Sequence, residues 1–143
     1  MRVTKAIYTE TSHRLMNHKG LCRNLHGHSY KWEVTISKMG ELDEMTGMLI
    51  DFHDIKDLLK EFIDEPFDHA TVLSNQDYAL RDFLEDQGFK LLLLDTHPTA
   101  ENFARKVACD ISRRLGGAYM VDVKCWETTT SYAEASSYEG LPN

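Results

Sequence analysis

The amino-acid sequence predicts a single α+β domain, in which an antiparallel sheet carries helices on one of its faces. Two observations support this class. Apolar and polar residues alternate near both ends of the chain, and apolar residues recur every three to four positions in the middle. The predicted order is strand, strand, helix, helix, strand, strand. A chain of 143 residues suits one domain, residues 1–143, around one core.

The first two strands are expected at residues 3–13 and 26–37. The second strand shows a clear alternation, and its apolar positions are Tyr30, Trp32, Val34 and Ile36. Side chains two apart on a strand share a face. His26 and His28 have the same parity as the apolar set, so they should point the same way as the apolar face. Residues 38–48 then form a polar turn.

Two long helices are expected in the middle of the chain. The first begins after Asp51, which is a suitable N-cap, and its apolar stripe ends at Pro66. The second begins after Thr99, which can cap it, and Gly116 stops it.

Shorter elements complete the order. A short helix is expected within residues 75–88 and a short strand at 90–95. Two further strands are expected at 119–125 and 132–138. Glu127 has the parity of the apolar set of the first of these strands, and burying an unpaired carboxylate there would be costly.

Composition excludes several classes of protein. The net charge is -7 and no basic block is present, which argues against a nucleic-acid partner. No apolar run approaches the roughly 20 residues that span a membrane. The first residues lack the apolar core of a signal peptide, so we expect a cytoplasmic protein. Three cysteines without a CxxC pair argue against a disulfide framework.

The segment His26-Gly27-His28 is the main candidate for a metal site. Two imidazoles at positions i and i+2 of a strand lie on one face, and Gly27 lets the backbone approach closely. The pair alone is a weak signal. If the first two strands form a hairpin, His13 at the end of the neighbouring strand becomes a third ligand. Three neutral imidazoles suit zinc with one open position.

Cys22 leaves three interpretations open. It could close the site as a fourth ligand of a structural zinc. It could instead lie just off the metal as a base or nucleophile, because a nearby cation lowers the pKa of a thiol. It could also be an inert cysteine. Cys109 and Cys125 lie within apolar patterns and are expected in the core.

Three acidic positions also admit two interpretations each. Asp68 and His69 are neighbours whose side chains would not normally bond, so a turn aspartate beside an exposed histidine is expected; the alternative is a relay beside a thiol. Glu127 could accept two parallel N–H groups from the edge of a pterin or guanine ring, or form a salt bridge. Glu101 lies in a first helical turn, where its charge is favourable in any case.

Taken together and in order, six motifs resemble the 6-pyruvoyl-tetrahydropterin synthase family. They run from His13 to about Tyr138 and are SHRL, CRNLHGHS, GMLIDFHDIK, FDHATVL, PTAENFA and WETTTSYAE. The three residues between Cys22 and the HGH motif resemble the 6-carboxy-tetrahydropterin synthase branch, QueD, of the pathway to queuosine and related 7-deazaguanines. The pyruvoyl-forming branch typically has a longer spacer, and the folate-related branch has glutamate instead of the cysteine.

The resemblance implies a zinc-dependent lyase acting on 7,8-dihydroneopterin triphosphate. The site residues that it implies are His13, His26 and His28 for zinc, Cys22, Asp68 and His69 for proton transfer, and Thr99, Glu101 and Glu127 for the substrate, with Glu127 anchoring the pterin ring. Two alternatives stay open. One is 6-pyruvoyl-tetrahydropterin synthase itself, which eliminates triphosphate without cleaving the side chain, and the other is a non-catalytic zinc-dependent pterin-binding module.

The resemblance also implies an architecture. The tunnelling fold has a four-stranded antiparallel sheet and two main helices, and sheets of several subunits join into a barrel. The expected assembly is a homohexamer of two trimers with active sites at interfaces. Asp68 and His69 would then reach the Cys22 of a neighbouring subunit.

Overall fold

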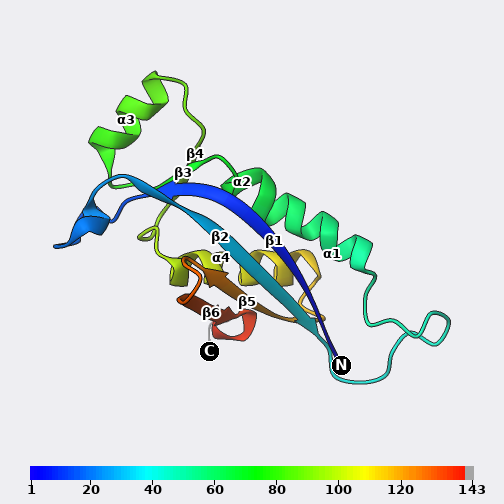
Figure 1. The fold of residues 1–143 in the computed structure, drawn as a ribbon. Helices are drawn as coiled ribbons and strands as arrows, with labels where there is room; N and C mark the ends of the chain where they lie inside the picture. The colour runs from blue at the N-terminus through cyan, green and yellow to red at the C-terminus, as the bar shows by residue number, and fades with distance from the viewer. Residues whose placement is uncertain (141–143) are drawn as a thin grey trace.

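A computed structural model describes residues 1–140, so the last three residues of the predicted domain lie outside the described part. Six strands form one curled sheet in the order β4-β3-β1-β2-β5-β6 (Figure 1). The two longest strands, β1 (Arg2–His13) and β2 (His26–Ser37), form an antiparallel hairpin in its middle. On one side β5 (Met120–Trp126) and β6 (Tyr132–Ser136) extend it, again antiparallel.

The other side of the sheet differs from the expectation. There β3 (Thr71–Ser74) runs parallel to β1, and β4 (Leu91–Leu94) runs parallel to β3. The predicted four-stranded, wholly antiparallel sheet is therefore wrong, although the α+β class is confirmed. A four-residue strand with three consecutive buried residues shows no alternation, so β3 has no period that a sequence pattern can reveal.

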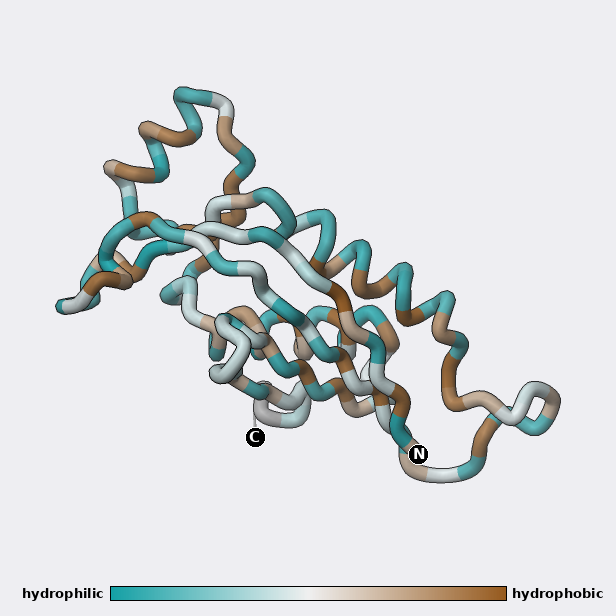
Figure 2. The backbone as a smooth tube through the Cα atoms, viewed as in Figure 1, coloured by the Kyte–Doolittle hydropathy of each residue, from teal (hydrophilic) through white to brown (hydrophobic). Residues whose placement is uncertain are grey.

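The helices pack mainly against one face of the sheet. Helix α4 (Ala100–Arg114) covers β5 and β6, and α1 (Phe52–Leu59) follows β1 (Figure 1). Figure 2 shows the apolar residues of α1 on its side toward the sheet. Their predicted N-caps are confirmed, because Asp51 accepts a hydrogen bond from the His53 N–H and Thr99 from the Asn102 N–H.

Helix α1 continues beyond its predicted end. A π-helical segment, Lys60–Asp64, leads into the single turn α2 (Glu65–Phe67). Pro66 has no N–H to donate, and the wider π turn before it accommodates the missing bond. Asp68 is the C-cap, so this helix carries the chain directly to the Asp68-His69 dipeptide.

The remaining elements are short. Helix α3 (Tyr78–Asp86) connects β3 to β4 and stands apart from the other helices (Figure 1). Two 3-10 turns, η1 (Leu21–Arg23) and η3 (Ser137–Gly140), lie in the β1–β2 connection and after β6. Among the helices of residues 1–140, none combines the length and apolar character that a membrane crossing needs.

The core lies between the sheet and the helices α1 and α4. The predicted apolar face of β2 is confirmed, because Tyr30, Trp32, Val34 and Ile36 are fully buried. Phe103 of α4 is also fully buried, and its ring packs against those of Tyr30 and Phe67. This aromatic cluster supports the end of the sheet where the histidines lie.

Candidate metal centre and substrate pocket

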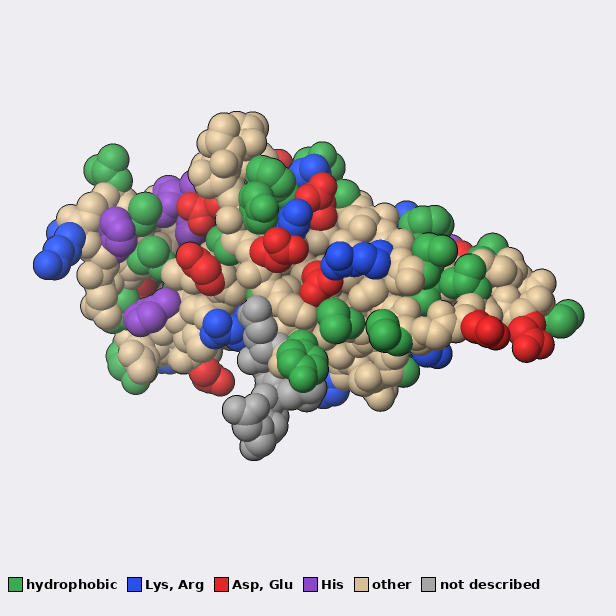
Figure 3. Space-filling view, turned by 90° about the horizontal axis from the view of Figure 1, so that it is seen from below, with side chains coloured by type: hydrophobic (Ala, Val, Ile, Leu, Met, Phe, Trp, Pro, Cys, Tyr) green, Lys and Arg blue, Asp and Glu red, His purple; other side chains and the backbone are tan. Residues whose placement is uncertain are grey.

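Three histidines meet at one end of the β1–β2 hairpin. His13 pairs with His26 in the ladder, and His28 follows two residues later on the same face. One ring nitrogen from each of the three lies within 4.8 Å of the others. The predicted hairpin and the proximity of His13 to the HGH motif are therefore confirmed. Histidine side chains gather at this end of the face seen in Figure 3.

The hydrogen bonds of the rings show which nitrogens are free to bind a cation. His13 Nδ1 lies 2.7 Å from the Pro98 carbonyl oxygen, and His26 Nδ1 lies 2.8 Å from that of Asn24. A carbonyl only accepts, so both Nδ1 atoms carry the proton and both Nε2 atoms keep a lone pair. This fixes the tautomer in which Nε2 is the metal ligand.

His28 provides the strongest indication that a cation belongs here. Its Nε2 is buried and has no hydrogen-bond partner within residues 1–140. A buried polar nitrogen without a partner is rare, because it costs free energy unless a ligand satisfies it. Burial also lowers the pKa of His28 and of His13, although the charge of Glu127 opposes this shift. Neutral imidazoles are the form that binds a metal, so the three residues fit a zinc ion with an open position.

A pocket of about 300 Å³ opens beside His13 and collects most of the other predicted site residues. Cys22 reaches it from η1, and Thr99 and Glu101 reach it from the beginning of α4. Glu127, just after β5, closes another side. A thiol, a carboxylate and a metal-ligating imidazole therefore share one cavity, although they come from distant parts of the chain.

The carboxylate of Glu127 faces the histidines. Its Oε1 lies 3.5 Å from His28 Nε2, and its side chain is 30% exposed. In the described part of the chain this is its only ion-pair contact, so the expected alternative of a salt bridge with a lysine or arginine is not formed. The carboxylate keeps acceptor capacity toward the pocket.

Asp68 and His69 are in contact, contrary to the expectation for adjacent side chains. His69 Nδ1 lies 2.6 Å from Asp68 Oδ2. The reason is the backbone of His69, whose φ of 55° is left-handed and turns its ring back over Asp68. The other oxygen of Asp68 accepts the Glu10 N–H at 2.9 Å. That bond and the contact with His69 lower the pKa of Asp68, so the pair is held as carboxylate and imidazole.

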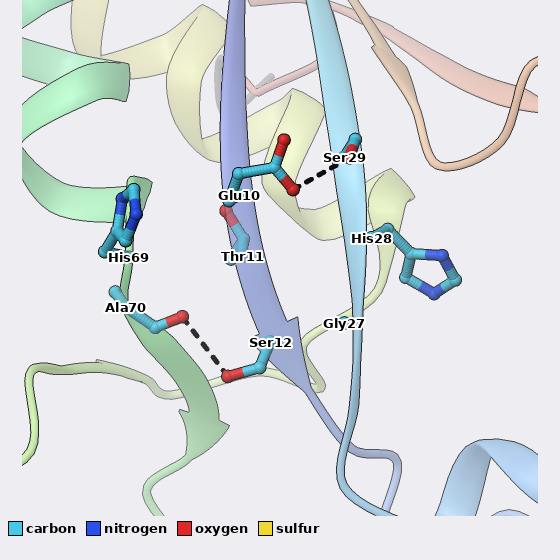
Figure 4. A pocket seen from close by; sticks show the side chains of 8 residues that line it. All are labelled: Glu10, Thr11, Ser12, Gly27, His28, Ser29, His69 and Ala70. Carbon is cyan, nitrogen blue, oxygen red and sulfur yellow. Dashed lines mark hydrogen bonds between the residues drawn. The ribbon is translucent and has the colours of Figure 1, made fainter.

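This pair does not lie in the same pocket as Cys22. His69 lines a second pocket of about 330 Å³, together with Glu10 and Ser29, which point to the opposite face of the sheet from His28 (Figure 4). His69 is 78% exposed. Within one chain, therefore, the structure groups the histidines, the thiol and Glu127, and it presents Asp68 and His69 elsewhere.

Sequence reasoning missed several groups that complete the site. The Tyr30 hydroxyl lies 3.2 Å from His13 Nε2, whereas the pattern placed Tyr30 only in the core. The carbonyls of Asn24 and Pro98 orient two histidines, and no residue type signals such a backbone role. Tyr30 could have been recognised, because it continues the row of His26 and His28 along the strand.

The fold and the site define a small α+β protein with an open three-histidine metal centre beside a thiol and a carboxylate. The sequence profile of the family described as 6-pyruvoyl tetrahydropterin synthase matches residues 2–137. The chain belongs to this family.

Individual relatives agree with this membership. A 6-carboxy-5,6,7,8-tetrahydropterin synthase of Rickettsia bellii is 35% identical over 138 residues, which cover 94% of this chain and 99% of that protein. Human 6-pyruvoyl tetrahydrobiopterin synthase is 28% identical, over 89% of this chain and 85% of that one. The solved structure of Caenorhabditis elegans 6-pyruvoyl tetrahydropterin synthase has the same fold, with a TM-score of 0.68, 22% identity and 94% coverage of both chains.

Proposed function

We propose that this protein is a zinc-dependent 6-carboxy-5,6,7,8-tetrahydropterin synthase of queuosine and 7-deazaguanine biosynthesis. It converts 7,8-dihydroneopterin triphosphate to 6-carboxytetrahydropterin, acetaldehyde and triphosphate. The observation that carries the proposal is the single pocket in which His13, Cys22 and Glu127 meet. The name of the Rickettsia relative supports this branch of the family, as does the short spacer between Cys22 and His26.

His13, His26 and His28 would hold the zinc ion through their Nε2 atoms. Their backbone partners, the Pro98 and Asn24 carbonyls, support this assignment. When bound, zinc supplies a Lewis acid that polarises the oxygens of the substrate side chain.

Cys22 would move protons on the substrate side chain. It is half-buried in the pocket rather than enclosed in the core, so it is accessible to a bound substrate. A thiolate beside a cation is a competent base near neutral pH. The first proton removal weakens the C–H bond next to the side-chain oxygens, and triphosphate leaves by elimination.

Glu127 would anchor the pterin ring. Its carboxylate can accept the two parallel N–H groups at the ring edge, which gives both energy and orientation. Thr99 and Glu101 line the same pocket at the beginning of α4 and would contact the remaining polar groups of the substrate. The Oγ of Thr99 already caps the helix, so it has limited freedom to move.

Asp68 and His69 would act on a neighbouring subunit in a homohexamer of two trimers. Their exposure on the opposite face of the sheet supports a role across an interface. Asp68 holds Nδ1 of the imidazole, which leaves Nε2 to exchange a proton with the substrate or with the neighbour's Cys22.

The test is direct. Purified protein is incubated with 7,8-dihydroneopterin triphosphate, with zinc or with a chelator, and the products are identified by mass. We expect 6-carboxytetrahydropterin and acetaldehyde with zinc only. A 6-pyruvoyl product would favour the other synthase of the family. Zinc-dependent pterin binding without turnover under any divalent metal would favour a non-catalytic module.

A further inference from the structure

Tyr30 contacts the atom of His13 that is needed for the metal. The Tyr30 side chain is fully buried, and its hydroxyl lies 3.2 Å from His13 Nε2. His13 Nδ1 already donates to the Pro98 carbonyl, so Nε2 accepts the phenol O–H. The Tyr30 ring packs against Trp32 and Phe103, which prevent the side chain from turning out to solvent.

This contact conflicts with metal binding at the same nitrogen. Nε2 has one lone pair, which cannot accept the phenol proton and coordinate a cation together. A buried hydroxyl that loses its acceptor is destabilising, so it requires another. The carboxylate of Glu127 is the acceptor at hand, because it approaches the histidine cluster at 3.5 Å from His28 Nε2. Burial and the nearby Glu127 charge both raise the pKa of Tyr30, so the phenol keeps its proton as a donor.

We propose that Tyr30 is a positioning residue that donates to His13 Nε2 in the metal-free protein and to the Glu127 carboxylate when the three histidines hold zinc. The inference rests on the proposed function, because it takes these histidines as zinc ligands and Glu127 as the pterin anchor. Metal occupancy would thereby fix the carboxylate before the pterin arrives. A carboxylate has about four acceptor positions, so it can hold the phenol and still receive the ring edge.

The experiment is a double-mutant cycle on zinc affinity in the full-length protein, measured by competition with a chromophoric chelator. The variants are Tyr30→Phe, Glu127→Ala and the pair. Exchanging a neutral acceptor for a charged one strengthens the phenol hydrogen bond and favours the zinc-bound state. We therefore expect Tyr30→Phe to weaken zinc binding about three- to tenfold with Glu127 present, and by less than about twofold with Glu127→Ala.

A matched control removes a different phenol. Tyr119 donates to the Leu49 carbonyl away from the histidines, so Tyr119→Phe should leave zinc affinity unchanged. A second measurement uses the tyrosine ultraviolet difference spectrum on addition of zinc. The signal should appear in the unmodified protein and in Tyr119→Phe, and it should be lost in Tyr30→Phe. Because the unmodified protein gives this signal, the test does not depend on the folding of any variant.

Three results would overturn the inference. Tyr30→Phe could weaken zinc binding equally in both backgrounds, it could tighten zinc binding, or the unmodified protein could bind zinc without a tyrosine signal. Each of these leaves the zinc site itself intact. Failure of the unmodified protein to bind zinc would overturn the inference together with the zinc-dependent function, and is thus distinguishable from them.

Discussion

His13 and His26 lie directly opposite each other in the β1–β2 ladder, with ring centroids 4.7 Å apart. The register of this hairpin therefore decides whether a metal site exists. A shift by one residue would turn His13 to the opposite face of the sheet, away from both histidines of β2. The apolar row that continues along β2 locks the register, because a slip would expose it.

Removing a histidine of the cluster should remove the metal. We expect His13→Ala and His26→Ala to lower zinc affinity by at least about tenfold, because two imidazoles bind zinc much less tightly than three. Zinc per chain is measured by elemental analysis after dialysis. His53→Ala is the control, since His53 is exposed on α1 outside the cluster. Unchanged zinc content in His13→Ala would contradict the assignment.

Replacing the thiol should separate catalysis from metal binding. We expect Cys22→Ala to keep zinc and to lower turnover about 100-fold or more, as for loss of a general base. Cys109→Ala on α4 is the matched control and should keep both. Loss of zinc in Cys22→Ala would instead make Cys22 a structural ligand.

The metal-free protein should lose stability in mild acid. Burial lowers the pKa of His13 and His28 below the ordinary value of 6.5, so the unfolded chain binds protons first as the pH falls. The free energy of unfolding should therefore decrease below about pH 6.5 until the folded-state pKa values are reached. Urea denaturation with a chelator, from pH 8 to pH 5, measures this. His28→Asn should give a flatter curve, and an equal slope would argue against the proposed cause.

Gly27 is required by close approach of the two strands. A Cβ at this position would lie 3.2 Å from the Thr11 carbonyl oxygen, so Gly27→Ala must push β1 and β2 apart between the ligands. We expect a loss of about 1–3 kcal/mol in the free energy of unfolding, together with weaker zinc binding. Ser29→Ala, at the next position with the same orientation, is the control. Equal zinc affinity in Gly27→Ala and Ser29→Ala would contradict this role.

Phe103 should support both the core and the site. It is fully buried, and its ring lies 6.1 Å from that of His13. Phe103→Ala should destabilise the protein by about 3–5 kcal/mol, because it leaves a cavity in the aromatic cluster. Phe103→Leu should cost much less, and urea denaturation compares the two. Similar losses would show that ring packing, rather than buried volume, stabilises this region.

Local patterns predicted the elements that surround the site. The alternation in β2, the caps Asp51 and Thr99 and the shared parity of His26 and His28 all depend on residues within a few positions of one another. The short strand β3 has no such pattern, so its parallel pairing with β1 was missed. The Asp68–His69 contact was missed for a related reason, because the left-handed backbone of His69 follows from its bonds to β1.

The sequence by itself determined the two-strand, two-helix framework and, through parity, the face on which its histidines lie. Only the tertiary structure decided which groups share the pocket. It brings Cys22, Glu101 and Glu127 to His13, it sets the tautomer of His13 through the Pro98 carbonyl, and it places the Tyr30 hydroxyl on His13 Nε2. The physical reason is sequence separation. Strand and helix periods are local, whereas these contacts form only when the sheet and α4 pack together.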